Sequence, residues 1–310
     1  MVQPARSVQP VQLGALFPQN EIGTDPEGIR RYAQAAEEIG CTHLLAYDHV
    51  LGANTENPSR QGQRFVYTHK DVFHEPFVLF SYLAAATQRI GLVTGVIILP
   101  QRQTALVAKQ AASLDVLSGG RLRLGVGIGW NTVEYEALGE DFENRSRRVE
   151  EQMKVLRLLW TQELVTFEGR WHRITDAGIN PLPVQRPIPL WIGGAQAAQM
   201  DQKNLDRVLR RMGRFADGWM LTGRPTEEVG RRFARVKEHA QAAGRDPSSI
   251  GLEGAVAYGD GMPDAWHADL KAWKELGATH ITLQTRGAGF TDPAQHEAAL
   301  RTMMDALRGA

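Results

Sequence analysis

The chain has 310 residues, which is long for one ordinary domain, although α/β barrels with insertions reach such lengths as one unit. Its 35 Lys and Arg residues balance its 35 Asp and Glu residues, which argues against nucleic-acid or anionic-membrane partners, because both require a basic excess. The single cysteine, Cys41, excludes an intrachain disulfide framework and a cysteine-rich metal site.

No apolar stretch approaches the ~20 residues that are needed to cross a membrane. Residues 1–10 are polar and lack the apolar core of a secretory signal. We therefore expect a polar N-terminal tail over residues 1–10, one domain over residues 11–310 and a cytoplasmic location.

Short apolar runs alternate with longer helical patterns along most of the chain. The expected strands cover residues 11–17, 43–50, 90–99, 122–128, 188–192, 218–221, 250–257 and 280–283. The expected helices cover about 26–39, 76–87, 104–117, 149–159, 204–214, 225–244, 264–276 and 293–307. Strands separated by helices pair in parallel through crossover connections, so these units predict an α/β fold, a (β/α)8 TIM barrel with insertions at its C-terminal face.

Two long stretches, residues 51–73 and 162–187, fit none of these units. Structureless connections of this length are uncommon in compact domains and often form lids over active sites. We therefore expect both stretches to cover the mouth of the barrel.

Asp48 and His49 end the second expected strand. The C-terminal ends of barrel strands carry the chemistry in this architecture, and a histidine can donate or accept a proton near neutral pH. A purely structural Asp–His pair is the alternative. The other histidines do not form a helical pair with zinc-binding spacing, so no metal site is predicted.

The segment from Gly125 to Gly129 resembles a dinucleotide-binding fingerprint only superficially, because Trp130 stands where the third glycine is required. A tight strand-end turn, or a close approach of backbone to a flat ligand, remains. Asn131 directly afterwards carries a donor and an acceptor that suit the edge of a heterocycle.

Gly193 and Gly194 end the fifth expected strand before a helix. Adjacent glycines there allow backbone amides to converge on an anion, although a plain turn is equally compatible. Trp130 and Trp171 fall in expected loops, where they could line an apolar wall for a ligand.

Several short segments, taken in order and spacing, point together to one family. They are Ala46-Tyr47-Asp48-His49, Thr94-Gly95-Val96, Leu117-Ser118-Gly119-Gly120-Arg121, Gly125-Val126-Gly127 with Gly129-Trp130-Asn131 and Glu134, Arg145…Glu150…Leu159-Trp160-Thr161, Pro189-Leu190-Trp191-Ile192-Gly193-Gly194, and Ala216-Asp217-Gly218-Trp219. Over nearly its whole length the chain resembles the bacterial luciferase-like superfamily of flavin- and deazaflavin-dependent oxidoreductases. The resemblance implies the same barrel that the alternation of strands and helices predicts.

Within that superfamily, an Asp–His pair after the second strand resembles the branch that uses the deazaflavin coenzyme F420. The resemblance implies that His49 and Asp48 are catalytic and that a cis peptide joins Gly95 to Val96 behind the ring. The cofactor-binding residues that it implies are Asp48, Gly95, Val96, Gly127, Ile128, Asn131, Gly193, Gly194 and Ala195.

The implied function is hydride transfer between F420 and a small organic substrate. The alternatives are an FMN-dependent two-component monooxygenase that uses O2 and a non-catalytic flavin-binding barrel. Sugar-phosphate dehydrogenases of the superfamily carry a glutamate and a tryptophan where this chain has Ile128 and Ala53, which favours a less polar substrate. Related proteins are often homodimers through the helices beside the second and third strands, and we expect the same here.

Overall fold

The computed structural model describes residues 10–60, 65–195, 201–260 and 263–309, so the predicted tail lies, apart from Pro10, outside the described residues. Within these ranges the chain forms a closed barrel of parallel strands in the order β3-β2-β1-β11-β10-β9-β8-β5, and the pairing of β3 with β5 closes it. The barrel strands are β1 (Gln12–Leu16), β2 (His43–Ala46), β3 (Gly91–Thr94) with β4 (Ile97–Ile98), β5 (Leu122–Gly127), β8 (Leu190–Gly193), β9 (Gly218–Met220), β10 (Gly251–Ala257) and β11 (His280–Gln284). The predicted (β/α)8 architecture is confirmed.

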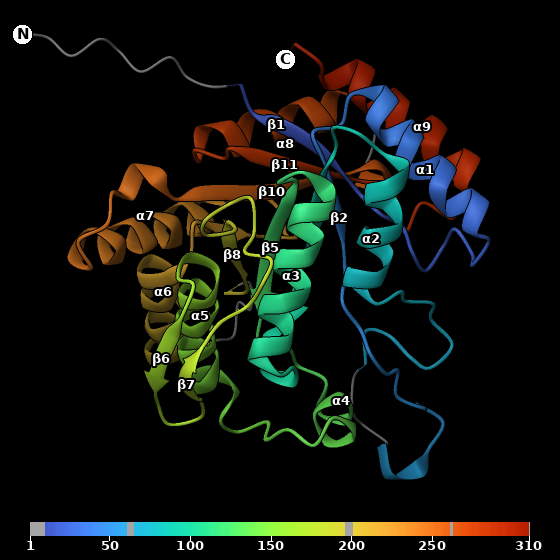
Figure 1. Ribbon diagram of the computed structural model, residues 1–310. Coiled ribbons are helices and arrows are strands. Elements are labelled where there is room, and N and C mark those ends of the chain that lie inside the picture. Colours follow the sequence, from blue (N-terminus) through green and yellow to red (C-terminus); the bar gives the residue numbers. More distant parts are fainter. Residues whose placement is uncertain (1–9, 61–64, 196–200, 261–262, 310) are drawn as a thin grey trace, which may run out of the picture.

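Helices surround the barrel on the outside (Figure 1). They are α1 (Pro26–Ile39), α2 (Pro76–Ala86), α3 (Thr104–Ser118), α4 (Thr132–Ala137), α5 (Arg145–Thr161), α6 (Gln202–Phe215), α7 (Glu227–Ala242), α8 (Pro263–Glu275) and α9 (Pro293–Leu307). The Asp25 and Asp292 side chains accept hydrogen bonds from backbone amides of the first turns of α1 and α9, which is why those helices begin there. No described helix is both long and apolar enough to span a membrane.

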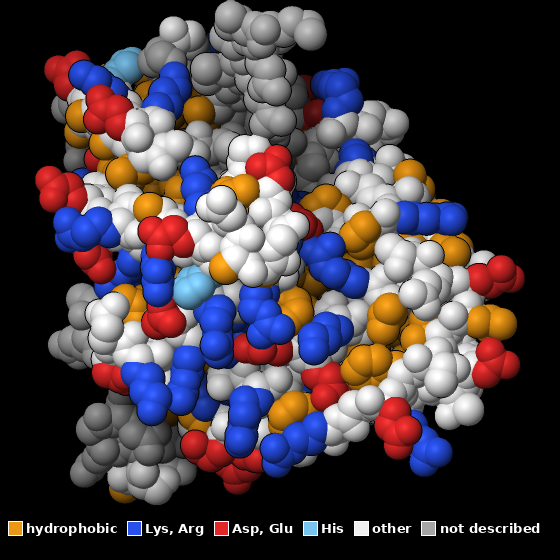
Figure 2. Space-filling model, turned by 90° about the vertical axis from the view of Figure 1, so that its left-hand side faces the viewer, with side chains coloured by type: hydrophobic (Ala, Val, Ile, Leu, Met, Phe, Trp, Pro, Cys, Tyr) orange, Lys and Arg blue, Asp and Glu red, His pale blue; other side chains and the backbone are white. Residues whose placement is uncertain are grey.

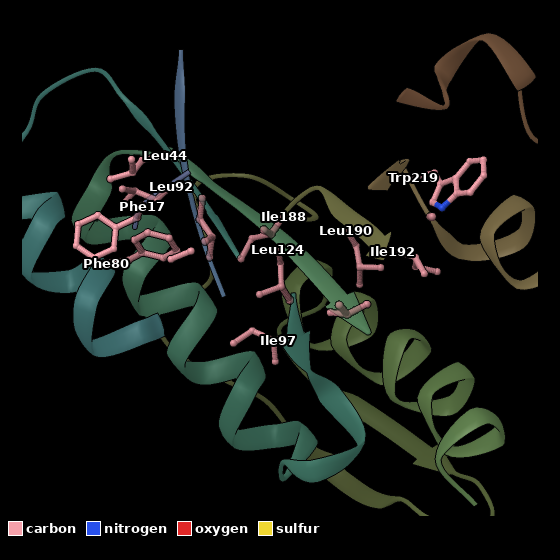
Figure 3. Close-up of a cluster of buried hydrophobic side chains, with 14 of the residues drawn as sticks. Phe17, Leu44, Phe80, Leu92, Ile97, Leu124, Ile188, Leu190, Ile192 and Trp219 are labelled. Atoms are coloured by element: carbon pink, nitrogen blue, oxygen red, sulfur yellow. The ribbon is translucent and has the colours of Figure 1, made fainter. Parts of the chain in front are cut away.

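Alternate residues of each strand contribute to two different cores. Leu44 and Leu92 are paired neighbours on β2 and β3 and lie in the main core between the strands and the helices (Figure 3). The next residues, Leu45 and Val93, instead fill the inside of the barrel together with Trp191. This alternation follows from the two-residue period of a strand, and it makes the barrel interior a packed core.

Charged side chains also lie inside the barrel, near the amino ends of the strands. The Glu253 carboxylate accepts hydrogen bonds from Thr282 and pairs with His43 Nε2 at 2.8 Å and with Arg123 Nη2 at 3.0 Å. Burial works to raise the pKa of Glu253, but Arg123 and His43 outweigh it and hold that pKa far below its ordinary value. This cluster lies at the end of the barrel opposite to the predicted site.

The stretch 162–187 differs from the structureless connection that we predicted. It contains an antiparallel hairpin of β6 (Val165–Glu168) and β7 (Arg173–Ala177), which lies beside α5 in Figure 1. Glu151 of α5 accepts hydrogen bonds from the backbone amides of residues 170–172 in the hairpin turn. The sequence pattern missed the hairpin because its strands are short and mostly exposed. Residues 61–64 of the other predicted lid, 51–73, lie outside the described ranges, and its role as a lid stays a prediction.

Ion pairs cover the outer helices. Figure 2 looks onto the side of the molecule where α6 and α7 lie, and Lys and Arg side chains gather there with acidic side chains among them. Along α7, Arg231 pairs with Glu228 at 2.8 Å and Arg235 with Glu238 at 2.6 Å. Such exposed pairs contribute only about 0.2–1 kcal/mol each, so the apolar cores dominate the stability of the fold.

Candidate active site

The carboxyl ends of the barrel strands meet at one mouth, and every residue predicted for the site lies there. Asp48 and His49 follow β2, Gly95 and Val96 separate β3 from β4, Gly127, Ile128 and Asn131 end or follow β5, and Gly193, Gly194 and Ala195 end or follow β8. These strands are neighbours in the barrel. The structure therefore brings the whole predicted set to one side of the mouth.

Asp48 is buried and fixes the end of β2 to the chain beyond β3. Its Oδ2 accepts a hydrogen bond from the Ile98 amide at 2.9 Å, and its Oδ1 accepts one from Arg102 Nη2 at 2.8 Å. The same guanidinium donates to Glu75 at 2.9 Å. Both carboxylate oxygens of Asp48 thus have protein donors, and within the described residues Asp48 makes no bond to the His49 ring.

His49 is held by a carboxylate from a different segment, Glu134 of α4. His49 Nδ1 lies 3.2 Å from Glu134 Oε1, which also accepts from the Val50 amide at 2.9 Å. Glu134 Oε2 accepts from Gln101 Nε2 at 3.1 Å. Burial works to raise the pKa of Glu134, but the donors His49 and Gln101 outweigh it, and the pKa lies below its ordinary value. The carboxylate facing His49 is therefore ionised at neutral pH.

Aromatic side chains surround His49 on its other sides. Its ring centroid lies 4.7 Å from that of Tyr67, 4.8 Å from that of Phe73 and 5.9 Å from that of Trp130. The prediction that Trp130 lines an apolar wall agrees with this placement. Trp171 instead lies in the hairpin turn, where its amide donates to Glu151, and among the described residues its ring makes no contact with this cluster.

Val96 fits the barrel mouth only because two neighbouring positions lack side chains. The Gly95–Val96 peptide is cis, as the family resemblance implies. A Cβ atom at Gly127 would lie 2.6 Å from Val96 Cγ2, and one at Gly193 would lie 2.8 Å from Val96 Cγ1. The two glycines therefore form the slot that receives the Val96 side chain.

Asn131 links two loops of the mouth. Its Oδ1 accepts a hydrogen bond from the Val133 amide and caps α4, and its Nδ2 donates to the Leu51 carbonyl oxygen at 3.1 Å. The Ile128 carbonyl oxygen accepts from the Tyr135 hydroxyl at 2.7 Å. Both residues thus have a clear structural role, and their contact with a cofactor stays a prediction.

The turn after β8, which we predicted to bind an anion, contains two consecutive residues with positive φ. Gly194 and Ala195 have φ values of 137° and 60°, and among the described residues no heavy atom beyond the two chain neighbours lies within 4 Å of the Cβ position of Gly194. The Trp219 indole nitrogen donates to the Gly194 carbonyl oxygen, and Arg232 donates to that of Ala195. Backbone amides of such a turn near a guanidinium suit a phosphate group, and Arg232 also pairs with Glu228 at 2.8 Å. The turn continues into residues 196–200, which lie outside the described ranges.

Sequence reasoning missed the two residues that hold the predicted pair. Glu134 lies 85 residues from His49, and Arg102 lies 54 residues from Asp48. Glu134 belongs to the segments that carry the family resemblance, which was its only signal in the sequence. Arg102 had none, because its role depends on how the barrel folds.

Comparison with known sequences identifies relatives along most of the chain. A profile of the luciferase-like monooxygenase family matches residues 8–308. An uncharacterised protein of Mycobacterium tuberculosis is 35% identical over 216 residues, which cover 69% of this chain and 71% of that protein. The FMNH2-dependent dimethylsulfone monooxygenase of Pseudomonas putida is 31% identical over 241 residues, covering 76% of this chain and 59% of that enzyme.

A solved structure shares the fold. The F420-dependent secondary alcohol dehydrogenase in complex with an F420–acetone adduct matches with a TM-score of 0.73 over 96% of this chain and 99% of its own. The two sequences are 18% identical, so this likeness concerns the fold alone. Because the family profile covers nearly the whole chain, the chain belongs to the luciferase-like monooxygenase family of flavin- or F420-dependent oxidoreductases.

Proposed function

We propose that the protein transfers a hydride between F420 and a small organic substrate, with His49 as the acid or base. The observation that carries this proposal is the contact of His49 with the buried, ionised Glu134 at the barrel mouth. A hydride that adds to a carbonyl carbon requires a proton at the carbonyl oxygen, and the reverse oxidation requires a base for the hydroxyl proton. A positioned histidine can serve either direction.

Glu134 also determines which nitrogen of His49 carries out that transfer. An ionised carboxylate only accepts hydrogen bonds, so the tautomer with a proton on Nδ1 is the one that satisfies the contact. Nε2 is then the nitrogen that takes a proton from the substrate or, once protonated, gives one. Within the described residues Nε2 has no hydrogen-bond partner.

The residues at the mouth fit the proposed cofactor. When bound, F420 supplies or takes up the hydride. Val96 would lie behind the ring, and the open turn at Gly194 and Ala195, with Arg232 beside it, would bind the phosphate. Gly95, Gly127, Ile128, Asn131 and Gly193 complete the proposed binding surface.

Asp48 takes a different part in this proposal from His49. Its two oxygens accept hydrogen bonds from Ile98 and Arg102, so it holds the segment that contains His49 against the segment that contains Val96. We therefore propose Asp48 as a positioning residue. The aromatic surroundings of His49 favour a substrate with a largely apolar surface.

The second candidate is an FMN-dependent monooxygenase that uses O2. The relative from Pseudomonas putida, an FMNH2-dependent monooxygenase, favours it. The cofactor decides between the two reactions, because a deazaflavin has carbon in place of the ring nitrogen N5 and reacts poorly with oxygen.

An anaerobic absorbance assay tests the proposed reaction. Purified protein is incubated with oxidised F420 and small alcohols, or with reduced F420 and unsaturated carbonyl compounds, and the F420 absorbance is followed. We expect a change in absorbance that requires both protein and substrate. Turnover that appears only with reduced FMN and oxygen would instead establish the monooxygenase.

We also propose a homodimer through the outer faces of α2 and α3. Large apolar side chains are exposed on these two helices, and in a soluble monomer such a group is a typical sign of an interface. They are Val78 and Tyr82 on α2 and Leu106, Val116 and Leu117 on α3.

A further inference from the structure

Arg286 follows β11 and lies at the same mouth of the barrel as His49. Its Nη1 donates a hydrogen bond to the Tyr67 hydroxyl at 2.8 Å. Its guanidinium carbon lies 5.3 Å from the ring centroid of Tyr47 and 5.8 Å from that of Tyr67. Since Tyr67 also contacts the His49 ring, one aromatic side chain separates Arg286 from the proposed acid or base.

The charge of Arg286 lacks a carboxylate partner within the described part of the chain, where no acidic oxygen lies within 4 Å of its guanidinium. Glu21 acts on it only from farther away, and that carboxylate accepts from the Gly287 amide and lies 3.5 Å from His296 Nε2. Arg102, at the same mouth, by contrast pairs with both Asp48 and Glu75. Burial works to lower the pKa of Arg286, but Tyr47, Tyr67 and Glu21 outweigh it and raise that pKa, so the mouth keeps a positive charge with which an anionic ligand can pair.

We propose that Arg286 determines specificity by binding a carboxylate of the substrate, so that the enzyme acts on small, largely apolar organic acids; this inference rests on the proposed function. A guanidinium has five N–H donors in a planar fork that matches a carboxylate, and only one of them is used by Tyr67. The apolar part of such an acid would contact Tyr67, Phe73 and Trp130 around His49.

F420 also carries anionic groups, so the cofactor is a second possible source of the anion. The barrel order separates the two sources. Only β1 lies between β11, which Arg286 follows, and β2, which His49 follows, whereas β10 and β9 lie between β11 and β8, which the phosphate turn follows. Arg286 is therefore on the His49 side of the mouth and away from the turn proposed for the phosphate, which favours the substrate.

Matched acids and amides test the proposal without knowledge of the natural substrate. Binding of benzoate and cinnamate, and of benzamide and cinnamamide, is measured by tryptophan fluorescence with wild type, Arg286→Gln, Arg286→Lys and the outer-surface control Arg235→Gln. We expect wild type to bind each acid at least about 10-fold more tightly than its amide. Arg286→Gln should abolish this preference. Arg286→Lys should retain only part of it, because lysine keeps the charge but lacks the planar fork, and Arg235→Gln should retain it fully.

Equal binding of acid and amide by wild type, including no binding of either, would overturn the proposal, and this arm needs no variant to fold. Titration with F420 separates the two sources of the anion. F420 affinity should change less than about 2-fold in Arg286→Gln, and a large loss with unchanged benzoate binding would assign Arg286 to the cofactor and overturn the proposal. If wild type discriminates acids but does not bind F420, the proposed function fails while the carboxylate site stands.

Discussion

His49 combines three features that a proton-transfer residue needs: a place at the barrel mouth, an anionic partner at Nδ1 and an apolar wall. The first could be predicted from the sequence, because His49 lies near the end of an expected strand and the barrel strands end at one mouth. The partner could not, because Glu134 reaches the ring only after β2 and β5 pair with their common neighbour β3. For the same reason the sequence could not predict that Arg102 binds Asp48 or that Arg286 binds Tyr67.

Replacing His49 should therefore affect chemistry more than binding. We expect His49→Ala to slow single turnover by roughly 10²–10⁴-fold at saturating cofactor, the range for a positioned acid or base, while F420 affinity falls much less. His69→Ala, an exposed histidine of the same loop, is the control and should leave both quantities unchanged. A normal single-turnover rate in His49→Ala would remove His49 from the mechanism.

Glu134 should make the stability of the fold depend on pH. Its folded-state pKa lies below its ordinary value of 4.5, so the ionised carboxylate stabilises the fold above pH 4.5, and this stabilisation is lost as the pH falls through the folded pKa. We expect Glu134→Gln to lower the free energy of unfolding by about 1–3 kcal/mol at neutral pH. In urea unfolding, the difference from wild type should shrink under acidic conditions.

Glu136→Gln is the matched control for that experiment, because Glu136 is exposed on the same helix α4. It should change the free energy of unfolding by less than about 0.5 kcal/mol. If Glu134→Gln loses the same free energy at acidic and neutral pH, its effect is packing alone, and the ionised contact with His49 is disproved.

At the scale of elements, regular strands and helices were predictable and irregular segments were not. The apolar runs and the capping residues Asp25 and Asp292 predicted β1 to β5, β8 to β11 and the long helices. The run over residues 90–99 is interrupted between β3 and β4, which only the family resemblance indicated. The β6–β7 hairpin is short and mostly exposed, and α4 has only six residues, so neither gives a clear periodic pattern.

The slot for Val96 between β5 and β8 can be tested by filling it. Gly127→Ala should lower the free energy of unfolding by about 1–3 kcal/mol, because its Cβ would lie 2.6 Å from the stiff, branched Val96 side chain. Gly223→Ala is the control, since no heavy atom of the described residues, its two chain neighbours aside, lies within 4 Å of that Cβ position. Chemical unfolding measures both.

A double variant identifies the cause of that loss. Removing the Val96 methyl groups in Gly127→Ala/Val96→Ala should recover part of the stability that Gly127→Ala loses, because the clash is then relieved. Strict additivity of the two single changes would show that Val96 does not occupy the slot.

At the scale of the whole molecule, closure of the barrel turns residues from distant segments into one site. β2, β3, β5 and β8 are consecutive around the barrel although about 150 residues separate the first from the last along the chain. The eight-unit alternation was enough to predict this closure. It could not indicate which side chains would meet inside the mouth, since that depends on register and loop conformation.

The proposed homodimer is tested on its apolar face. Leu106→Glu places a charge among the exposed apolar side chains of α2 and α3. In light scattering coupled to size exclusion, we expect wild type to be a dimer and Leu106→Glu to be a monomer. Leu164→Glu changes an equally exposed leucine next to the β6–β7 hairpin and should remain a dimer. A monomeric wild type, or a dimeric Leu106→Glu, would contradict the proposed interface.

The proposed reaction depends on which cofactor the protein binds, and calorimetric titration with F420 and with FMN measures this choice. We expect F420 to bind at least ~10-fold more tightly than FMN, which corresponds to about 1.4 kcal/mol. Equal affinity, or tighter binding of FMN, would contradict the deazaflavin assignment and favour the monooxygenase.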